Sequence, residues 1–434
     1  MAWDIACSAS TPLKASGDPI KVGWMNPEGD PNGTFPEFTV AAKVAVDYIN
    51  NVLGGVGSDL KAGKPGRPIT LDVCNEAITP ADSTKCANQL VSDKNFVNIS
   101  TLNFFGNNWP ILQGSGSPTF ALTPISVADF TTPGVFGIGS GGGCVGAHPG
   151  LIDFSANTLK AKKIAIPWAD TPPGVVCYYD LEKKPVDILA GTVDGPAKAK
   201  GIDAGLTSLG VPIKPAQPDI TAQASQVLAF KPDAMVFSAQ DSDCWSLVNT
   251  LGKLGWTPSS IPLVMSGSCV DTNKAKQAGA LSKGIYFIGV PPMSEPDNQT
   301  DAVLKAESQN YVDLMNKAGG TAAKDFSLGF AVQGFAGIMQ MYQYLGAAAT
   351  ANGGIASLTG DQVNTWMKAT TSVHIYGGTP LGCSTALAPY VAVCSHLVSV
   401  IQWTGTGYKL VKPSFDPTYI IAGTKIDTGP PGAS

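Results

Sequence analysis

Residues 19–51, PIKVGWMNPEGDPNGTFPEFTVAAKVAVDYINN, decide how the rest of the chain is organised. The stretch opens with a short apolar run at 20–25, typical of a buried strand, and from Phe38 its apolar residues recur three and four positions apart, as in a helix. Between them lies a loop of Asn, Pro, Gly and Asp that lacks the glycine pattern of a tight pyrophosphate-binding turn. The stretch predicts strand, wide loop and helix, the first unit of a parallel α/β sheet with a ligand-binding edge at the loop.

The same alternation continues along the chain. Helix-length segments separate further apolar runs, which predict strands at 68–77, 96–102, 118–125, 162–170, 232–240, 261–268 and 284–292. Helices are expected near 194–209, 221–230 and 242–254, and a third helical block at 302–349. Residues 397–411 alternate in polarity and predict a terminal hairpin. The pattern therefore favours two α/β sheets laid end to end.

Composition and charge exclude several classes of function. The 434 residues carry a net charge of −5 without basic clusters, which argues against nucleic acid as a partner and gives no sign of binding to an anionic membrane. The length and the 44% hydrophobic content suit two domains. No apolar run reaches the length of about eighteen residues that a transmembrane helix needs. The start of the chain has neither the basic nor the apolar region of a signal peptide, so we expect it to begin after processing.

The nine cysteines indicate the compartment. They form no C-x-x-C motif, and the three histidines form no H-x-x-x-H motif, so no metal site is expected. The close spacing of Cys74 with Cys86 and of Cys383 with Cys394 predicts two disulfides and an oxidising compartment, with unpaired buried thiols as the alternative. Two further candidate pairs, Cys144–Cys177 and Cys244–Cys269, leave Cys7 as the odd one.

An ordered set of motifs carries a resemblance to a known family. The set is strand, wide loop and helix, then D-x-C…P-A-x-x-x-x-C at 72–86, then PDAMVFSAQ at 232–240 followed by a helix. It resembles the type I periplasmic binding proteins, in particular the branched-chain amino-acid-binding proteins of ABC importers. The late segment with Cys383 and Cys394 is similar to the version common in actinobacterial members.

The resemblance implies an α/β fold of two Rossmann-like lobes, joined by three crossovers and closing on a solute by hinge bending. It places the crossovers near 139–143, 287–290 and 376–380. Residues 1–19 would form an N-terminal extension, residues 20–141 and 289–376 the N-terminal lobe, and residues 142–288 and 377–434 the C-terminal lobe.

The resemblance also suggests where a ligand binds. In amino-acid-binding members, hydroxyls and amides that correspond here to 103–107 and 123–126 bind the ligand carboxylate. The two segments expected to bind the ammonium group, 140–143 and 266–269, contain no Asp or Glu. A buried ammonium without a carboxylate is costly, so an α-amino acid is disfavoured, unless Asp170 or Asp241 substitutes.

Aromatic residues in the strand-end loops favour an aromatic or apolar ligand instead. Trp109 and Trp245 also lie in such loops, but we expect them to pack beneath the loops. The ligand-binding candidates are Trp24, Asn26, Phe35, Phe104, Phe105, Gly106, Asn107, Thr123, Ser126, Gly142, Trp168, Asp170, Gln240, Asp241 and Ser268.

Other chemistries find little support. The G-x-G-x-x-G match at 137–142 lies at the expected first crossover and not in the first strand–helix turn. We therefore interpret its glycines as residues that let a hinge rotate or a ligand approach, and we expect no cofactor. The chain lacks G-x-S-x-G, H-E-x-x-H and P-loop motifs, so no enzyme is expected, although a secreted hydrolase remains an alternative.

The sequence therefore predicts a monomeric, extracytoplasmic solute-binding protein, periplasmic or a cell-surface lipoprotein. Its partners would be a small organic solute, aromatic or apolar and either neutral or carboxylate-bearing, and an ABC permease. An amino-acid-binding protein of the same family and a ligand-sensing receptor domain of the same fold are the alternatives.

Overall fold

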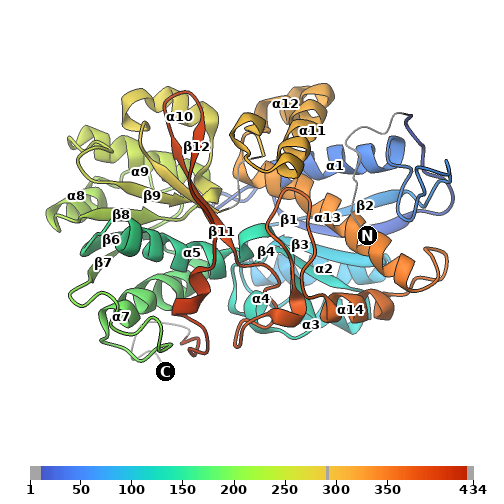
Figure 1. Ribbon diagram of the computed structural model, residues 1–434, viewed down its shortest axis with the longest axis horizontal. Helices are drawn as coiled ribbons and strands as arrows, with labels where there is room; N and C mark the ends of the chain where they lie inside the picture. The colour runs from blue at the N-terminus through green and yellow to red at the C-terminus, as the bar shows by residue number, and fades with distance from the viewer. Residues whose placement is uncertain (1–10, 290–292, 428–434) are drawn as a thin grey trace.

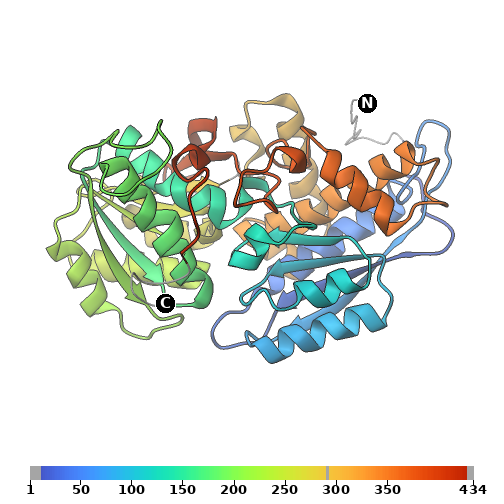
Figure 2. The ribbon, with the colours of Figure 1, turned by 90° about the horizontal axis from the view of Figure 1, so that it is seen from below.

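The computed structural model describes residues 11–289 and 293–427, which form two α/β lobes side by side (Figure 1, Figure 2). The first lobe contains a parallel sheet of five strands in the order β2-β1-β3-β4-β5. Its central strand is buried along its whole length, because helices cover both faces of the sheet. The strands are β1 (Ile20–Pro27), β2 (Ile69–Glu76), β3 (Val97–Leu102), β4 (Thr119–Thr123) and β5 (Val135–Gly137).

The second lobe repeats this topology and adds a hairpin. Five parallel strands follow the order β7-β6-β8-β9-β10, which is the order of the first lobe with new members. The predicted terminal hairpin is confirmed: it pairs antiparallel with the last of these strands, in red in Figure 1. The strands are β6 (Lys163–Ala169), β7 (Thr207–Ile213), β8 (Ala234–Phe237), β9 (Leu263–Ser266), β10 (Tyr286–Gly289), β11 (Val398–Trp403) and β12 (Tyr408–Phe415).

Helices of the first lobe come from both halves of the chain. Helix α1 begins with a proline in its first turn and buries the apolar stripe predicted from the sequence. It packs against α13, and a Cβ at Gly334 of α13 would lie 2.3 Å from the Phe38 carbonyl oxygen, so only glycine allows this approach. The helices are α1 (Pro36–Asn51), α2 (Pro80–Ser92), α3 (Trp109–Gly114), α4 (Val127–Thr131), α11 (Ala302–Ala318), α12 (Gly320–Asp325), α13 (Gly329–Ala351) and α14 (Gly360–Ala369).

Helices of the second lobe are shorter on average, and two of them continue into π-helical turns. The α-helices are α5 (Cys144–Asp153), α6 (Pro172–Tyr178), α7 (Lys184–Ala190), α8 (Thr221–Ala229), α9 (Asp241–Lys253) and α10 (Thr272–Ala278). The π-helical turns are η2 (Phe154–Thr158) and η3 (Tyr179–Lys183). The 3-10 turns are η1 (Ser140–Gly142), η4 (Gly267–Cys269), η5 (Gly279–Leu281), η6 (Pro296–Asn298), η7 (Cys383–Thr385) and η8 (Pro417–Ile420).

The helix expected at 194–209 is wrong. Residues 197–205 form turns, and β7 begins at Thr207. Gly201 and Gly205 adopt φ angles of 66° and 94°, which no right-handed helix contains. The Ala and Lys residues of this stretch favour a helix, but its glycines end one before it can form.

Four disulfides join cysteines of the described residues, and both local pairs are confirmed. Cys74–Cys86 joins β2 to α2, and Cys383–Cys394 closes a loop before β11. The two further candidate pairs, Cys144–Cys177 and Cys244–Cys269, are bonded as well. Cys7 lies outside the described residues. Within the described ranges, no helix has both the length and the apolar character needed to cross a membrane.

The third crossover was expected near 376–380. Tyr376, Leu381 and Cys394 belong to the core of the first lobe, whereas Tyr390 and Val393 pack in the core of the second lobe. Val393 also forms a bridge with Gly137 at the edge of the first sheet, so the segment before β11 contacts both lobes. The second crossover was expected to include Val290, which lies outside the described residues.

Candidate functional site

The carboxyl ends of the strands in both lobes meet at a cleft. Leu102 and Thr123 line it at the ends of β3 and β4, and Ala169 and Ser266 line it at the ends of β6 and β9. The empty space between the walls, open mouth included, is about 1350 Å³. A space of this kind suits a small organic molecule.

All phenylalanine rings among the described cleft-lining residues come from the first lobe. Phe35 precedes α1, Phe104 follows β3 and Phe330 lies in the first turn of α13. Phe35 and Phe330 meet edge to face with ring centroids 5.4 Å apart, and Phe330 also stacks on Phe38 at 4.7 Å. These contacts hold the rings in place before a ligand arrives, so the first lobe offers a rigid apolar wall.

The second lobe supplies most of the polar wall. The Ser238 hydroxyl donates to Ser266 Oγ at 2.9 Å, Ser266 Oγ lies 2.6 Å from Ser268 Oγ, and Ser268 donates to the Ala239 carbonyl oxygen at 2.8 Å. Since a carbonyl can only accept, each hydroxyl proton points along the chain towards Ala239. The serines therefore present lone pairs to the cleft and not protons.

A carboxylate also lines the cleft, at a position that the sequence reasoning missed. Asp243, in the first turn of α9, accepts hydrogen bonds from the backbone N–H of Ala216 at 3.1 Å and from Gln240 Nε2 at 3.0 Å. Burial raises the pKa of Asp243 above its ordinary value. The lack of Asp and Glu at the two expected segments thus does not leave the cleft without a carboxylate.

The second ionisable side chain of the lining is His148 of α5. Its residue is 6% exposed, and its Nδ1 lies 2.8 Å from Glu182 Oε1. Glu182 is 1% exposed, and burial, before any other cause, raises its pKa, whereas His148 lowers it. No Lys or Arg is among the described residues that line the cleft.

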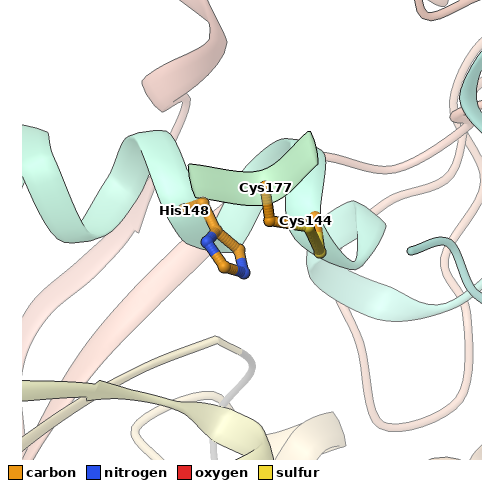
Figure 3. A group of neighbouring side chains, drawn as sticks. All are labelled: Cys144, His148 and Cys177. Atoms are coloured by element: carbon orange, nitrogen blue, oxygen red, sulfur yellow. A yellow bond between two sulfur atoms is a disulfide. The ribbon is translucent and has the colours of Figure 1, made fainter. Parts of the chain in front are cut away.

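His148 also lies beside the Cys144–Cys177 disulfide, as Figure 3 shows. The two sulfur atoms and a ring nitrogen of His148 fall within 4.8 Å of one another, the spacing of a metal site. Metals bind thiolates, and both sulfurs are bonded to each other here. The oxidised form therefore offers only the imidazole.

Five of the candidate ligand-binding residues line the cleft: Phe35, Phe104, Thr123, Gln240 and Ser268. The others lie elsewhere, for reasons that the sequence does not reveal. Trp24 and Asn26 are fully buried. Trp24 Nε1 and Asn26 Nδ2 each donate a hydrogen bond to Thr39 Oγ1, at 3.2 Å in both cases.

The loop after β3 directs most of its side chains away from the cleft. Phe105 contacts Phe104 but is not part of the lining. The Asn107 amide donates to the Pro80 carbonyl and to Thr84 Oγ1, both at 2.8 Å, and thereby ties the loop to α2. Gly106 lies against Ala128 of α4.

In the second lobe, Trp168 packs inward. Its ring stacks on Tyr178 with centroids 5.1 Å apart, so the neighbouring Ala169 faces the cleft instead. Asp170 is exposed beyond β6. Gly142 packs against the backbone of 395–396, while its neighbours at 141 and 143 line the cleft.

Asp241 forms an ion pair with Lys274 instead of lining the cleft. It nevertheless faces the other lobe. Burial, foremost, raises the pKa of Glu37 on α1 to about 8, and the charge of Asp241 adds to this effect. Acidic groups of the two lobes thus repel each other.

Asp129, a buried carboxylate of α4, holds the two loops that were expected to bind a ligand carboxylate. It accepts from the backbone N–H groups of Ile125 and Ser126, both at 2.9 Å, from Trp109 Nε1 at 2.7 Å and from Asn103 Nδ2 at 3.0 Å. Ser126 in turn caps α4 through its side chain. These donors already have an internal anion and are not free for a ligand.

The sequence analysis missed four residues that line the cleft: Phe330, Gln333, His148 and Asp243. Phe330 and Gln333 stand in the first turns of a long apolar helix, where the pattern suggested only core. His148 follows the first crossover by a few residues, and Asp243 follows a predicted strand end by a few residues. Their closeness to these two points in the sequence is the signal that could have identified them.

Comparisons with known proteins were made for the whole chain. Residues 19–386 match a family model described as periplasmic binding protein. No curated protein matches the chain. Because the solved structures described next are less than 25% identical to this chain, their similarity shows a shared fold.

The solute-binding protein of an ABC transporter from Rhodopseudomonas palustris BisB5, in complex with 3,4-dihydroxybenzoic acid, is 18% identical with a TM-score of 0.67 and covers 92% of this chain and 98% of its own. LivJ from Streptococcus pneumoniae, in complex with isoleucine, is 14% identical with a TM-score of 0.63 and covers 91% and 100%. A fatty acid ABC transporter substrate-binding protein from Thermomonospora curvata is 16% identical with a TM-score of 0.65 and covers 94% and 95%.

Proposed function

We propose that this chain, which belongs to the periplasmic binding protein family, is the solute-binding protein of an ABC importer for a small ring-bearing organic molecule. The observation that carries the proposal is the asymmetric cleft, in which rigid phenylalanine rings of one lobe face the polar wall of the other. The protein would act as a monomer outside the cytoplasm. The four disulfides support that location, because they persist in oxidising compartments.

Closing the lobes would perform the function without a chemical step. Phe35, Phe104 and Phe330 would cover the ring, and a closing second lobe would bring its hydroxyls and the Gln240 amide onto the ring's substituents. Apolar burial would supply most of the affinity, and the polar groups would select the solute. The closed form would then be the one that the membrane permease recognises.

The ligands of the similar structures support an organic solute of this size and leave its class open. One similar structure holds a dihydroxybenzoic acid and another isoleucine, and a third is described as a fatty acid transporter protein. A phenylalanine wall suits a planar or alicyclic ring better than a long chain, because a flat face meets flat faces.

An amino acid is the second candidate, and Asp243 is the observation that favours it. Its carboxylate lines the cleft and would face an ammonium group. Both its oxygens already accept a hydrogen bond, and burial raises its pKa, so it is a weaker anion than an exposed aspartate.

A thermal-shift and calorimetric screen tests the proposal. Aromatic and alicyclic acids, their neutral amides, and the proteinogenic amino acids form the panel. We expect ring compounds to stabilise the protein most. Micromolar binding of simple aliphatic amino acids, with no response to ring compounds, would refute the ring-bearing class and favour the second candidate.

Two adjacent phenylalanines provide a matched pair of variants. Phe104 lines the cleft, whereas Phe105, also half-buried and in the same loop, does not. We expect Phe104→Ala to weaken ring binding about tenfold or more, since burying a phenylalanine ring contributes about 1.5–3 kcal/mol. Phe105→Ala should change it less than about threefold. Equal effects of the two variants would contradict the assignment of the wall.

A further inference from the structure

We propose that His148, positioned by Glu182, binds the acidic group of the solute, so that anionic ring compounds bind with their negative group at this imidazole. This inference rests on the proposed function, because it assigns the charge of the ring-bearing solute. It makes His148 a residue that determines specificity and Glu182 a positioning residue.

The geometry leaves one nitrogen of His148 for a ligand. Nδ1 faces Glu182 Oε1 at 2.8 Å, and Nε2 has no hydrogen-bond partner among the described residues. The side chain is 8% exposed, yet His148 lines the cleft, so its small exposed part faces the space where a solute would lie. An unpartnered polar nitrogen held in a fixed position at a cleft is a prepared binding group.

His148 is also the only cleft-lining side chain in the described ranges that can carry a positive charge. Gly143 and Cys144, at the N-terminal end of α5, line the same cleft and add the positive end of the helix dipole. The anion would thus meet a fixed imidazole and a helix N-terminus on one element.

Several other donors of the cleft are already occupied. In the first lobe, Asp129 takes the backbone N–H groups of Ile125 and Ser126, and the Thr123 hydroxyl donates to Gln333. In the second lobe, the serine hydroxyl protons point along their own chain towards the Ala239 carbonyl. A solute carboxylate placed at any of these groups would face lone pairs or would have to break an existing bond.

The buried pair determines which protonation state faces the cleft. With one proton shared between them, Nδ1–H donates to the Glu182 carboxylate, the pair is negative, and Nε2 presents a lone pair. With two protons the pair is neutral overall and Nε2–H donates to the cleft. Glu182 is fully buried and its Oε2 has no hydrogen-bond partner, so the neutral pair is favoured by desolvation. A bound anion favours the same state, because Nε2–H can then donate to it.

Other titratable groups near α5 are accounted for by their own contacts. Those on the elements packed against it are Asp153 with Lys412 and Tyr419, Asp180 with Lys184, Asp187 with Lys183, Asp416 with His396, and the phenols of Tyr178, Tyr179 and Tyr286. Across the cleft, Asp243 is the carboxylate that would oppose an anion, so the solute's acidic end should lie away from it.

The test compares benzoate with benzamide, and cyclohexanecarboxylate with its amide, by calorimetry at near-neutral pH. We expect each acid to bind the wild type about tenfold tighter than its amide. His148→Gln should weaken acid binding about tenfold and change amide binding less than about threefold.

Two further variants separate a binding role from a structural one. Glu182→Gln leaves His148 in place without its anionic partner, so the acid-to-amide affinity ratio should fall while amide binding changes less than about threefold. His374→Gln disrupts a comparable His–Glu pair outside the cleft and should leave the acid-to-amide ratio unchanged.

The outcomes are distinguishable. An acid preference that survives His148→Gln, or equal binding of acids and amides by the wild type, would overturn this inference and leave the proposed function intact. Failure of every ring compound to bind would overturn both.

Discussion

Replacing Asp129 by asparagine should destabilise the first lobe strongly. The carboxylate is fully buried and accepts four hydrogen bonds, two at each oxygen. Asparagine keeps one oxygen, and its NH₂ group must then face one pair of donors. Two hydrogen bonds to a charged group are lost, at about 1.5–3 kcal/mol each, which predicts a loss of about 3–6 kcal/mol in the free energy of unfolding.

Guanidinium unfolding measures this loss, followed by tryptophan fluorescence because Trp109 donates to the mutated group. Burial raises the pKa of Asp129 to about 6, so the measurement belongs near pH 8, where the wild-type group is ionised. At about 2–4 °C per kcal/mol for a lobe of this size, the melting temperature should fall by roughly 10 °C.

The control is Asp313→Asn, which makes the same change on the exposed face of α11, where the carboxylate accepts only from Gln309 among the described residues. It should alter stability by less than about 0.5 kcal/mol. If Asp129→Asn proved equally mild, with an unchanged denaturant slope, the account of these loops as held by a buried anion would be wrong. Asn103, which donates to Asp129, directly precedes the cleft-lining Phe104. Binding of ring compounds should therefore weaken in Asp129→Asn as well.

Three other perturbations test the frame around the cleft. His374 donates to Glu307, and this hydrogen bond raises the pKa of His374. Its stabilising effect should be complete below about pH 6.5 and should disappear as the pH rises through the raised pKa. The difference in unfolding free energy between the wild type and His374→Gln should therefore shrink from about pH 6 to pH 9 in urea titrations. Replacing Cys74 and Cys86 together by serine should cost about 3 kcal/mol in chemical unfolding, as expected for a loop of 12 residues. Gly334→Ala should cost about 1–3 kcal/mol in the same assay, because its Cβ would meet the backbone of α1.

Each of these three predictions has an outcome that would contradict it. A His374→Gln difference that grows with pH would reverse the sign of the proposed linkage. Retention of wild-type stability by the double serine variant, or by the wild type after full reduction, would show that the disulfide is not a stabilising constraint. Gly114→Ala, at a helical glycine with no neighbouring atom within 4 Å, is the control for Gly334→Ala and should be neutral or stabilising.

Local patterns determined the architecture of this protein. The alternation of buried runs with 3.6-period segments predicted eight of the ten parallel strands and several of the helices, because both periods arise from backbone geometry within a few residues. The short strand β5 and the edge strand β7 were not predicted. Cysteines within about a dozen residues of each other were predicted to pair for the same local reason. The one helix predicted wrongly, at 194–209, failed where glycine backbone preference outweighed the helix propensity of its neighbours.

The cleft, in contrast, depends on contacts between residues far apart in the chain. Whether a strand-end aromatic faces the ligand space or the core depends on its neighbours in space. Trp168 stacks on Tyr178 and is buried, whereas Phe104, tilted against its neighbour Phe105, lines the cleft. Phe330 reaches the cleft because α13 packs on α1, which lies about three hundred residues earlier in the sequence. This packing brings the rings of Phe35 and Phe330 into contact. The sequence alone shows that aromatic residues follow several strands and that charged residues are scarce. Only the packed lobes decide which rings and which charges meet, because burial and pairing are properties of neighbours in space.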